Sequence, residues 1–370
     1  MTPRERVIAA IEHRETDRVP VDYWGTPEYD TRLIRHFGVE SRDRMLEKLG
    51  VDLRYIYASG IIYEDPAGLF KPTPRHIGPP RSKFPDGSFE DLWGVTRKLV
   101  KVHSGNSYRE AIKNPLRHMT SLVEIQTYDK WPQAEDFDFS NMRDACTAWP
   151  DYAIAVGGMP GCATVFIQCW YSRGLDQILL DLIEAPDIAH AIIEKITVFQ
   201  LEYHRRLLDE IGDLVQILML ADDFGTQQGL MMSPQHFREF FRKPLESLIA
   251  LGKEYELKIM LHCDGHIRRL IPDFIEMGID ILNPIQNVGP GMEPEGLKTE
   301  FGKHLCFHGG IDTQEVLPHI SPQEVKREVE EKAALLSKGG GYIISPTHML
   351  QLDVPLKNVI AFYEPFGIEA

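Results

Sequence analysis

Short apolar runs alternate with longer helical patterns along most of the chain, and the alternation is most regular after residue 151. The short runs are rich in β-branched and aliphatic side chains, whereas the stretches between them repeat apolar side chains at helical spacing. Eight strands are predicted on this basis, at residues 18–24, 52–58, 153–158, 214–221, 257–263, 279–285, 304–309 and 341–346. Eight strands with helices between them is the number of a (β/α)8 barrel, the TIM-barrel fold of the α/β class.

Helices are predicted before the first strand and between the later ones. Thr2, Pro3 and Glu5 form a helix-start pattern, and the helix behind them should end near His13. A second helical stretch is predicted over residues 27–49. The remaining helical stretches are predicted at 174–211, 233–255, 266–277, 293–301, 321–338 and 355–364.

Residues 60–150 depart from this alternation. They contain a proline-rich stretch, PTPRHIGPP, and then Asp86-Gly87 between alternating apolar positions, which is a hairpin signal. We expect this segment to be an insertion that covers the mouth of the barrel. The whole chain, residues 1–370, is then a single domain with helices at its N-terminus and a hairpin-containing insertion.

The charge balance excludes one class of partner. The chain has 40 Lys and Arg against 55 Asp and Glu, a formal net charge of −15, whereas binding to a phosphate backbone needs clustered basic residues. The first residues are charged throughout, unlike a secretory signal, and no window approaches ~18 uninterrupted apolar residues. The five cysteines are scattered, with no CxxC pair. We therefore expect a cytoplasmic protein with free thiols and no nucleic-acid or membrane partner.

Polar side chains gather where the predicted strands end. Because the carboxyl ends of barrel strands meet on one face, residues that are scattered in the sequence are expected to form one site there. These residues are Asp222, Asp223, His262, Asp264, Asn283, Gln286, His308, Asp312, Thr347 and His348.

His262, Asp264 and His348 are the candidate metal ligands. His262 and Asp264 are two residues apart, so in an extended chain their side chains point the same way. With His348 from another strand end, they supply enough nitrogen and oxygen donors for a zinc site with an open position. The alternative is that both histidines are hydrogen-bonded structural residues at the starts of loops.

Asp222 and Asp223 directly follow a buried apolar run. Two successive carboxylates there would be costly to desolvate without a partner, so at least one is expected to face the pocket. It could act as a metal ligand, a proton carrier or a hydrogen-bond acceptor, and the sequence leaves open which of the two it is. Cys263 and Cys306, inside apolar runs, are more typical of buried structural cysteines than of ligands.

His308 ends another strand and is followed by two glycines and then by Asp312. This segment could bind substrate or merely shape its loop. The chain has no dinucleotide-binding fingerprint, no Walker loop and no GxSxG elbow. Hydride transfer and nucleotide hydrolysis are therefore not expected.

The residues that carry a family resemblance span almost the whole chain. They are the segments TPRERVIAAIEHRETDRVPV, ADDFGTQQGLMMSPQHFREFFRKPL, LHCDGHI, CFHGGIDTQ and GGGYIISPTHMLQLDVPLKNVIAFYE. In these segments the chain resembles the uroporphyrinogen decarboxylase superfamily, which includes corrinoid-dependent methyltransferases of the methylcobamide:coenzyme M type and the methyltransferase components of O-demethylase systems. The resemblance implies the same (β/α)8 barrel.

Within that superfamily, two departures bear on function. The arginine-rich segment with which true decarboxylases grip substrate carboxylates is replaced by VPVDYWGTPEYD, and no arginine occurs from this stretch until Arg32. The methyltransferase branch resembles the chain at LHCDGHI and SPTHM, where its members hold zinc with a histidine and two cysteines. Here His262 is retained, whereas Asp264 and His348 stand at the cysteine positions. Zinc accepts these harder ligands, but thiol activation of the coenzyme M type is disfavoured.

The resemblance therefore implies methyl transfer between a small methylated substrate, such as an aryl methyl ether, and a cobalamin on a separate corrinoid-binding protein. Zinc would act as a Lewis acid, with Asp222 or Asp223 as fourth ligand or proton carrier and His308 as a further catalytic group. The candidate substrate-binding residues are Tyr23, Trp24, Gln227, Asn283, Gln286 and Asp312.

Two alternatives stay open. One is a metal-free decarboxylase of a tetrapyrrole or small aromatic acid, with Asp222 or Asp223 near the substrate. The other is a non-catalytic barrel that binds a corrinoid or its carrier protein. The resemblance also implies a homodimer, since relatives often form one.

Overall fold

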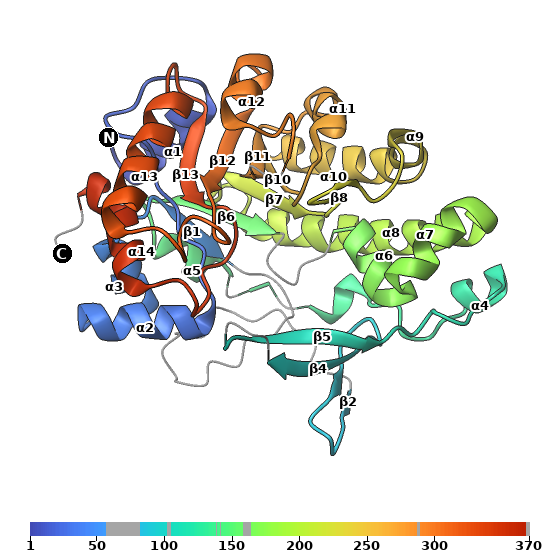
Figure 1. Ribbon diagram of the computed structural model, residues 1–370. Helices are drawn as coiled ribbons and strands as arrows, with labels where there is room; N and C mark the ends of the chain where they lie inside the picture. Colours follow the sequence, from blue (N-terminus) through green and yellow to red (C-terminus); the bar gives the residue numbers. More distant parts are fainter. Residues whose placement is uncertain are drawn as a thin grey trace.

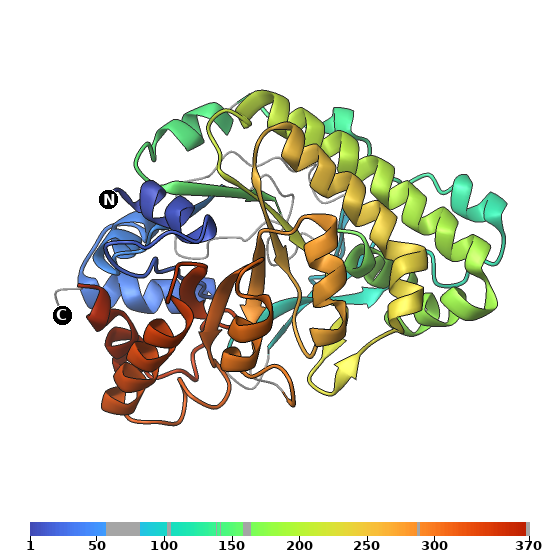
Figure 2. The same cartoon turned by 90° about the horizontal axis from the view of Figure 1, so that it is seen from above.

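The computed structural model describes residues 1–56, 82–101, 105–137, 139–140, 142–157, 164–286 and 289–367. Within them, parallel strands form one curled seven-stranded sheet in the order β1-β6-β7-β10-β11-β12-β13 (Figure 1). The strands are β1 (Leu53–Ile56), β6 (Ala153–Gly157), β7 (Ile217–Ala221), β10 (Lys258–His262), β11 (Ile281–Ile285), β12 (Cys306–Ile311) and β13 (Tyr342–Pro346). Helices surround the strands, as the view from above shows (Figure 2). The predicted TIM-barrel-like class is confirmed.

The predicted strand at 18–24 is only partly formed. Val21 and Gly25 make isolated parallel bridges to residues in and just beyond β13. On its other side, the carbonyl of Val21 accepts a hydrogen bond of 2.9 Å from the N–H of Asp52, just before β1. The segment therefore lies between β13 and β1, where an eighth strand would close the sheet. Residues 57 and 58 of the next predicted strand lie outside the described residues.

Each predicted helical stretch contains helices, with breaks that the sequence explains, whereas the helices at Leu122–Gln126, Met142–Thr147 and Phe166–Arg173 lie outside the predicted stretches. The stretch at 27–49 divides after Phe37, because Gly38 adopts a left-handed φ of 63° and ends the first helix. The stretch at 174–211 divides at Pro186, whose missing N–H cannot continue the preceding helix. The α-helices are α1 (Pro3–Ile11), α2 (Pro27–Phe37), α3 (Arg42–Lys48), α4 (Leu122–Gln126), α5 (Met142–Thr147), α6 (Phe166–Arg173), α7 (Leu175–Glu184), α8 (Pro186–Ile211), α9 (Pro234–His236), α10 (Lys243–Glu254), α11 (Ile271–Met277), α12 (Pro294–Phe301), α13 (Pro322–Leu336) and α14 (Leu356–Tyr363).

Short irregular helices complete these stretches. A π-helical turn at Phe237–Arg242 joins α9 to α10, so the stretch predicted at 233–255 remains one helical run. The turn lies just before Pro244, which has no N–H to bond the carbonyl four residues earlier. Helices of the 3₁₀ type are found at Ala134–Asp136, Arg268–Leu270 and Glu364–Phe366.

Inside the curled sheet, the layer of side chains nearest the amino-terminal ends of the strands is apolar. Alternate strand residues point inward and pack together with Val7 and Ile11 of α1, which closes the amino-terminal end of the strands. The strand members of this layer are Leu53, Ala153, Ala155, Ile217, Met219, Met260, Ile281, Cys306 and Ile343. The next inward position, two residues further along four of these strands, is polar: His262, Asn283, His308 and Ser345. The pleat thus stacks a polar layer on the apolar one, at the carboxyl ends of the strands.

The outer faces of the strands pack against the helices in a second apolar cluster. Cys263 belongs to this outer cluster, so it faces away from the neighbouring His262, as the pleat predicts. Cys306 belongs to the inner layer. These two thiols, Cys146 and Cys169 are unpaired and buried, whereas Cys162 lies outside the described residues.

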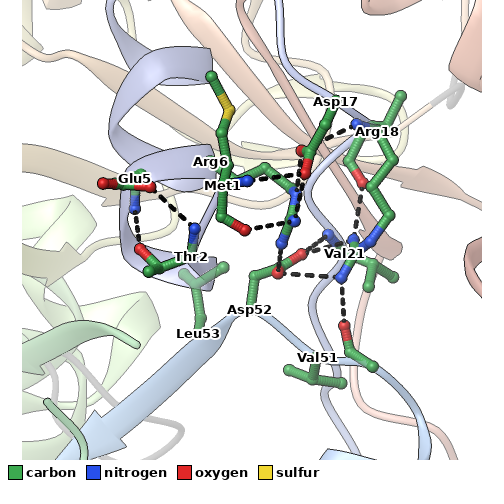
Figure 3. A network of polar contacts seen from close by, with 12 residues as sticks. Met1, Thr2, Glu5, Arg6, Asp17, Arg18, Val21, Val51, Asp52 and Leu53 are labelled. Atoms are coloured by element: carbon green, nitrogen blue, oxygen red, sulfur yellow. Dashed lines mark hydrogen bonds and ion pairs between the residues drawn. The ribbon is translucent and has the colours of Figure 1, made fainter. Parts of the chain in front are cut away.

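The buried carboxylate of Asp52 binds several groups of the N-terminal segment (Figure 3). Asp52 accepts hydrogen bonds from Arg6 at 2.6 Å, from Arg18 at 2.7 Å and from the N–H of Val21 at 2.9 Å. Thr2 begins α1 with the reciprocal capping box that its sequence predicts. One side chain therefore joins α1, the segment that closes the sheet and the start of β1.

The region predicted as an insertion contains a small antiparallel sheet in the order β2-β3-β4-β5. Its strands are β2 (Ser82–Lys83), β3 (Phe89–Glu90), β4 (Thr96–Lys101) and β5 (Ser107–Lys113), and β2 and β3 form the hairpin predicted at Asp86-Gly87. Asn106, just before β5, donates to Thr26 at 2.6 Å and accepts from the N–H of Leu352 at 2.9 Å. The region thus contacts loops that follow the sheet-closing segment and β13. That it covers the mouth stays a prediction.

No helix in the described part of the chain is long and apolar enough to cross a membrane.

Candidate metal centre

The structure brings the three predicted ligands together. His262 ends β10, Asp264 follows it in the next turn, and His348 lies two residues after β13. One ligand atom from each residue lies within 4.8 Å of the other two. Oδ2 of Asp264 is 3.8 Å from Nε2 of His262 and 3.8 Å from Nε2 of His348.

The two separations from the Asp264 carboxylate are close to those in a tetrahedral zinc site, and the ligand atoms of the two histidines lie within 4.8 Å of each other. With Zn–N and Zn–O bonds of roughly 2.0–2.2 Å, neighbouring ligand atoms lie about 3.4 Å apart. The 3.8 Å separations would therefore need to shorten by only a few tenths of an ångström. Two imidazoles and one carboxylate also form a donor set that zinc accepts, and they leave a position for water or substrate.

Asp223 is the acid that lies beside this cluster. Its Oδ1 is 3.9 Å from Nε2 of His262 and accepts a hydrogen bond of 2.9 Å from the backbone N–H of Asp264. Burial raises the pKa of the Asp223 carboxyl, and nearby Asp264 raises it further, whereas His262 opposes the shift. Of the two neighbouring acids, Asp223 is therefore the one whose carboxylate lies beside the cluster. The sequence alone did not distinguish it from Asp222.

Asp222 points to a different element. Its carboxylate accepts hydrogen bonds of 2.9 Å from the N–H groups of Val165 and Ile167, at the start of α6. Burial raises the pKa of Asp222 to about 7, although those backbone donors lower it. This side chain therefore joins the end of β7 to the N-terminus of α6, where a carboxylate is favourable. Its backbone N–H donates to the carbonyl of His262 at 3.0 Å, and its catalytic role stays a prediction.

The two candidate histidine ligands have different electrostatic surroundings. Burial lowers the pKa of His262, but Asp264 and Asp223 more than compensate, so the net shift is upward. Burial also lowers the pKa of His348, and Asp264 does not offset it. Without a metal, a proton is therefore held more readily on His262 than on His348.

Behind His262 lies a chain of buried hydrogen bonds. Nδ1 of His262 is 2.6 Å from Oδ1 of Asn283, and Nδ2 of Asn283 is 2.5 Å from Nδ1 of His308. Nε2 of His308 is 2.9 Å from Oδ2 of Asp22. Asn283 and His308 are almost completely buried beneath His262. Their proposed roles in substrate binding and catalysis stay predictions, and the contacts that the structure shows are with one another.

Asp22 was missed by the sequence reasoning. It is buried inside the predicted strand at 18–24, and its Oδ2 also accepts from Trp24 Nε1 at 3.1 Å and from the Tyr55 hydroxyl at 2.6 Å. A carboxylate within an apolar strand was the signal that could have identified it, because such a group needs buried partners.

The neighbouring aromatic side chains of Tyr23 and Trp24 point to opposite sides of the backbone. The Trp24 ring packs on His262, with ring centroids 5.4 Å apart, and therefore adjoins the cluster. The Tyr23 hydroxyl donates to Asp30 at 2.6 Å in the buried outer layer. Of the two, Trp24 is the one beside the cluster, and the substrate contacts of both stay predictions.

The other candidate polar residues are also divided. Gln286 donates from Nε2 to Asp264 at 3.2 Å and accepts from the N–H of Gly265 at 2.9 Å, so it holds the turn that carries the candidate ligand Asp264. Gln227 is exposed and donates to Gln314. Asp312 accepts from the N–H groups of the loop that follows it, at 2.6 Å for Gln314. Gln227 and Asp312 remain predicted substrate contacts.

Comparison with known proteins supports the resemblance. The sequence profile of the family described as Uroporphyrinogen decarboxylase (URO-D) matches residues 101–366. The uroporphyrinogen decarboxylase of Coxiella burnetii strain RSA 493 is 21% identical over 291 residues, which cover 75% of this chain and 74% of that protein. Uroporphyrinogen decarboxylase 2 from chloroplasts of Arabidopsis thaliana is 23% identical over 217 residues, 56% of this chain and 50% of that protein.

A solved structure extends the likeness over the whole chain. A methyltransferase from Methanosarcina mazei matches with a TM-score of 0.65, at 15% sequence identity, over 99% of both chains. At this identity the match establishes the fold alone.

Proposed function

The chain belongs to the uroporphyrinogen decarboxylase family, and we propose that within it the chain is a methyltransferase. It moves a methyl group between a small methylated substrate, such as an aryl methyl ether, and a cobalamin carried by a separate corrinoid-binding protein. The observation that carries the proposal is the convergence of His262, Asp264 and His348 at the carboxyl ends of two strands. The similarity in fold to a protein named as a methyltransferase agrees with it.

In this proposal the three convergent side chains hold one zinc ion. When bound, zinc supplies Lewis acidity toward the heteroatom that carries the methyl group, and it makes that heteroatom a better leaving group. Asp223, next to His262, is either a fourth ligand or the group that takes up or returns the proton of that heteroatom. Trp24, packed on His262, supplies an apolar wall that limits the access of water.

A metal-free decarboxylase is the second candidate, because the curated relatives are decarboxylases by name. To bind a substrate that carries several carboxylates, the site would need arginine side chains. Arg32, the first arginine after the closing segment, instead donates to the carbonyl of Val354 at 3.1 Å and stacks on Tyr29. This arrangement favours the methyltransferase over the decarboxylase.

The test combines metal analysis with a methylation assay. The purified protein should contain about one zinc ion per chain, and it should methylate cobalamin from a member of a panel of methoxyaromatics, methylamines and methylthiols. His262→Ala should remove both zinc and activity, whereas His319→Ala, at an exposed histidine, should retain both. Full activity in metal-free protein, or in His262→Ala, would contradict the proposal.

The remaining outcomes separate the alternatives. Decarboxylation of a tetrapyrrole or aromatic acid without metal would establish the second candidate. Binding of a corrinoid protein without turnover of any methyl donor would indicate a non-catalytic barrel.

A further inference from the structure

The buried chain of hydrogen bonds behind the cluster has a direction that can be derived. It begins at Trp24, whose indole N–H can only donate and lies 3.1 Å both from Oδ2 of Asp22 and from the hydroxyl oxygen of Tyr55. The Tyr55 hydroxyl lies 2.6 Å from the same Asp22 oxygen. A carboxylate oxygen can only accept, so the Nε2–H of His308 donates to Oδ2 of Asp22 at 2.9 Å.

The donor and acceptor roles of the remaining hydrogen bonds follow from this one. With its proton on Nε2, neutral His308 presents Nδ1 as an acceptor, and Nδ2 of Asn283 donates to it at 2.5 Å. The amide of Asn283 is thereby oriented with its oxygen toward Nδ1 of His262, 2.6 Å away. An amide oxygen can only accept, so neutral His262 must carry its proton on Nδ1. Its Nε2 lone pair then faces Asp264 and the cluster.

Ser345 is the other group that could donate to Nδ1 of His308, but its hydroxyl proton is used elsewhere. The hydroxyl of Ser345 lies 3.4 Å from Nδ1 of His308, but it donates to the carbonyl of Pro346 at 2.8 Å. The short contact from Asn283 is therefore the one that satisfies Nδ1 of His308. Among the described residues, Oδ1 of Asp22 has no hydrogen-bond partner, so all the donors to this carboxylate converge on one oxygen.

From this geometry we infer that Asp22 is a positioning residue: through His308 and Asn283 it fixes His262 as the Nδ1–H tautomer, with Nε2 free to bind a metal. Metal-binding histidines are generally oriented by a partner at their second nitrogen. Here the orienting carboxylate lies three hydrogen bonds away from the ligand. The inference rests on the metal centre of the proposed function, but the tautomer itself is a property of the metal-free protein.

We call the chain of hydrogen bonds from Asp22 through His308 and Asn283 to His262 the relay. It predicts a specific effect of Asp22→Leu, which removes the carboxylate that accepts from His308. His308 loses the partner that holds its proton on Nε2, so the proton moves to Nδ1 and the amide of Asn283 turns over. Nδ2 of Asn283 then donates to Nδ1 of His262, and His262 takes the Nε2–H form, with its proton pointing at the cluster. His308→Leu interrupts the same relay one step later and releases Asn283 in the same way.

A compensating change should restore the tautomer. In the double variant Asp22→Leu with Asn283→Asp, the new carboxylate accepts from Nδ1–H of both histidines. His262 is again held as Nδ1–H without Asp22. A purely structural role for Asp22 would not be rescued by a change at Asn283.

The tautomers can be read directly by ¹⁵N NMR of histidine-labelled, metal-free protein at about pH 9, well above the ordinary histidine pKa of roughly 6.5. The wild type should show Nδ1–H at His262 and Nε2–H at His308. In Asp22→Leu or His308→Leu, whichever folds, His262 should show Nε2–H, or a mixture of both forms. Ser345→Ala, which removes a buried hydroxyl beside His308, should leave the wild-type pattern unchanged.

Zinc affinity, measured by competition with a chromophoric chelator, should follow the tautomer. We expect a loss of roughly 10- to 100-fold in Asp22→Leu and its recovery in the double variant. Nδ1–H at His308 in the wild type, or an unchanged His262 in a folded relay variant, would overturn the inference. If the wild-type protein shows the expected tautomers but binds no zinc, the relay stands and the proposed metal centre fails.

Discussion

The backbone N–H of Asp264 donates to Oδ1 of Asp223 at 2.9 Å, which connects the acid that follows β7 to the turn after β10 that carries the candidate ligand Asp264. The preceding residue, Asp222, faces the N-terminus of α6 instead. Two successive carboxylates are thus held at the end of one strand by different partners. One is part of the candidate site, and the other is part of the framework around it.

Asp223→Asn should therefore weaken metal binding without unfolding the protein. The asparagine oxygen can still accept from Asp264, but the negative charge beside His262 is lost. We expect the zinc affinity to fall by roughly tenfold, measured by chelator competition. Asp264→Asn, at a candidate ligand, should cause a larger loss. Equal zinc affinity in Asp223→Asn and the wild type would show that Asp223 does not act on the metal.

Asp222 should make the stability depend on pH. Its pKa is about 7 in the folded chain, because burial disfavours the charged form, against 3.8 for the unperturbed group. Between these values the folded state binds more protons than the unfolded state, so stability should fall as pH rises from about 4 to 7. At full effect the loss approaches about 4 kcal/mol.

Urea unfolding at a series of pH values would measure this dependence. In Asp222→Asn the neutral amide keeps an acceptor for α6, and the fall in stability over this range should shrink. Asp151→Asn makes the same chemical change at an exposed aspartate and should retain the wild-type dependence. Identical pH profiles for Asp222→Asn and the wild type would refute the assignment.

Gln286 should influence metal binding at the candidate centre through Asp264. Its Nε2 donates to Oδ1 of Asp264 at 3.2 Å, which leaves Oδ2 directed at the two histidines. Gln286→Leu removes this donor, so the carboxylate can rotate, and the zinc affinity should fall by about 10-fold or more. The matched control is Gln227→Leu, because Gln227 lies on the surface and bonds to Gln314. A similar affinity in both variants would contradict this role for Gln286.

The barrel and its candidate ligands could be predicted because local rules specify them. Each predicted strand from residue 153 onward overlaps an observed one, since buried parallel strands are marked by apolar runs. The side chains of His262 and Asp264 share a direction because they are two residues apart in extended chain. His348 joined them because strand ends converge in this fold.

The partners of these residues could not be predicted in the same way. The choice between Asp222 and Asp223 depends on the start of α6, more than 50 residues earlier in the chain. The connection from Asp22 to His308 spans 286 residues and depends on how the sheet closes. The hydrogen bond between Asn283 and His308 could not be predicted either, because a strand end alone does not reveal which polar groups bond to each other beneath the surface.

Closure of the sheet itself should depend on Asp52. This fully buried carboxylate accepts from Arg6 and Arg18, and the Arg6 side chain is itself largely buried. Asp52→Ala leaves the guanidinium of Arg6 without this partner in a poorly solvated position, and breaking such a pair typically costs about 3–5 kcal/mol. Asp17→Ala removes the other carboxylate that Arg6 contacts, but Asp17 is 43% exposed, so its loss should cost about 1 kcal/mol or less. Urea unfolding compares the two variants, and equal losses of stability would show that Asp52 does not hold the closing segment in place.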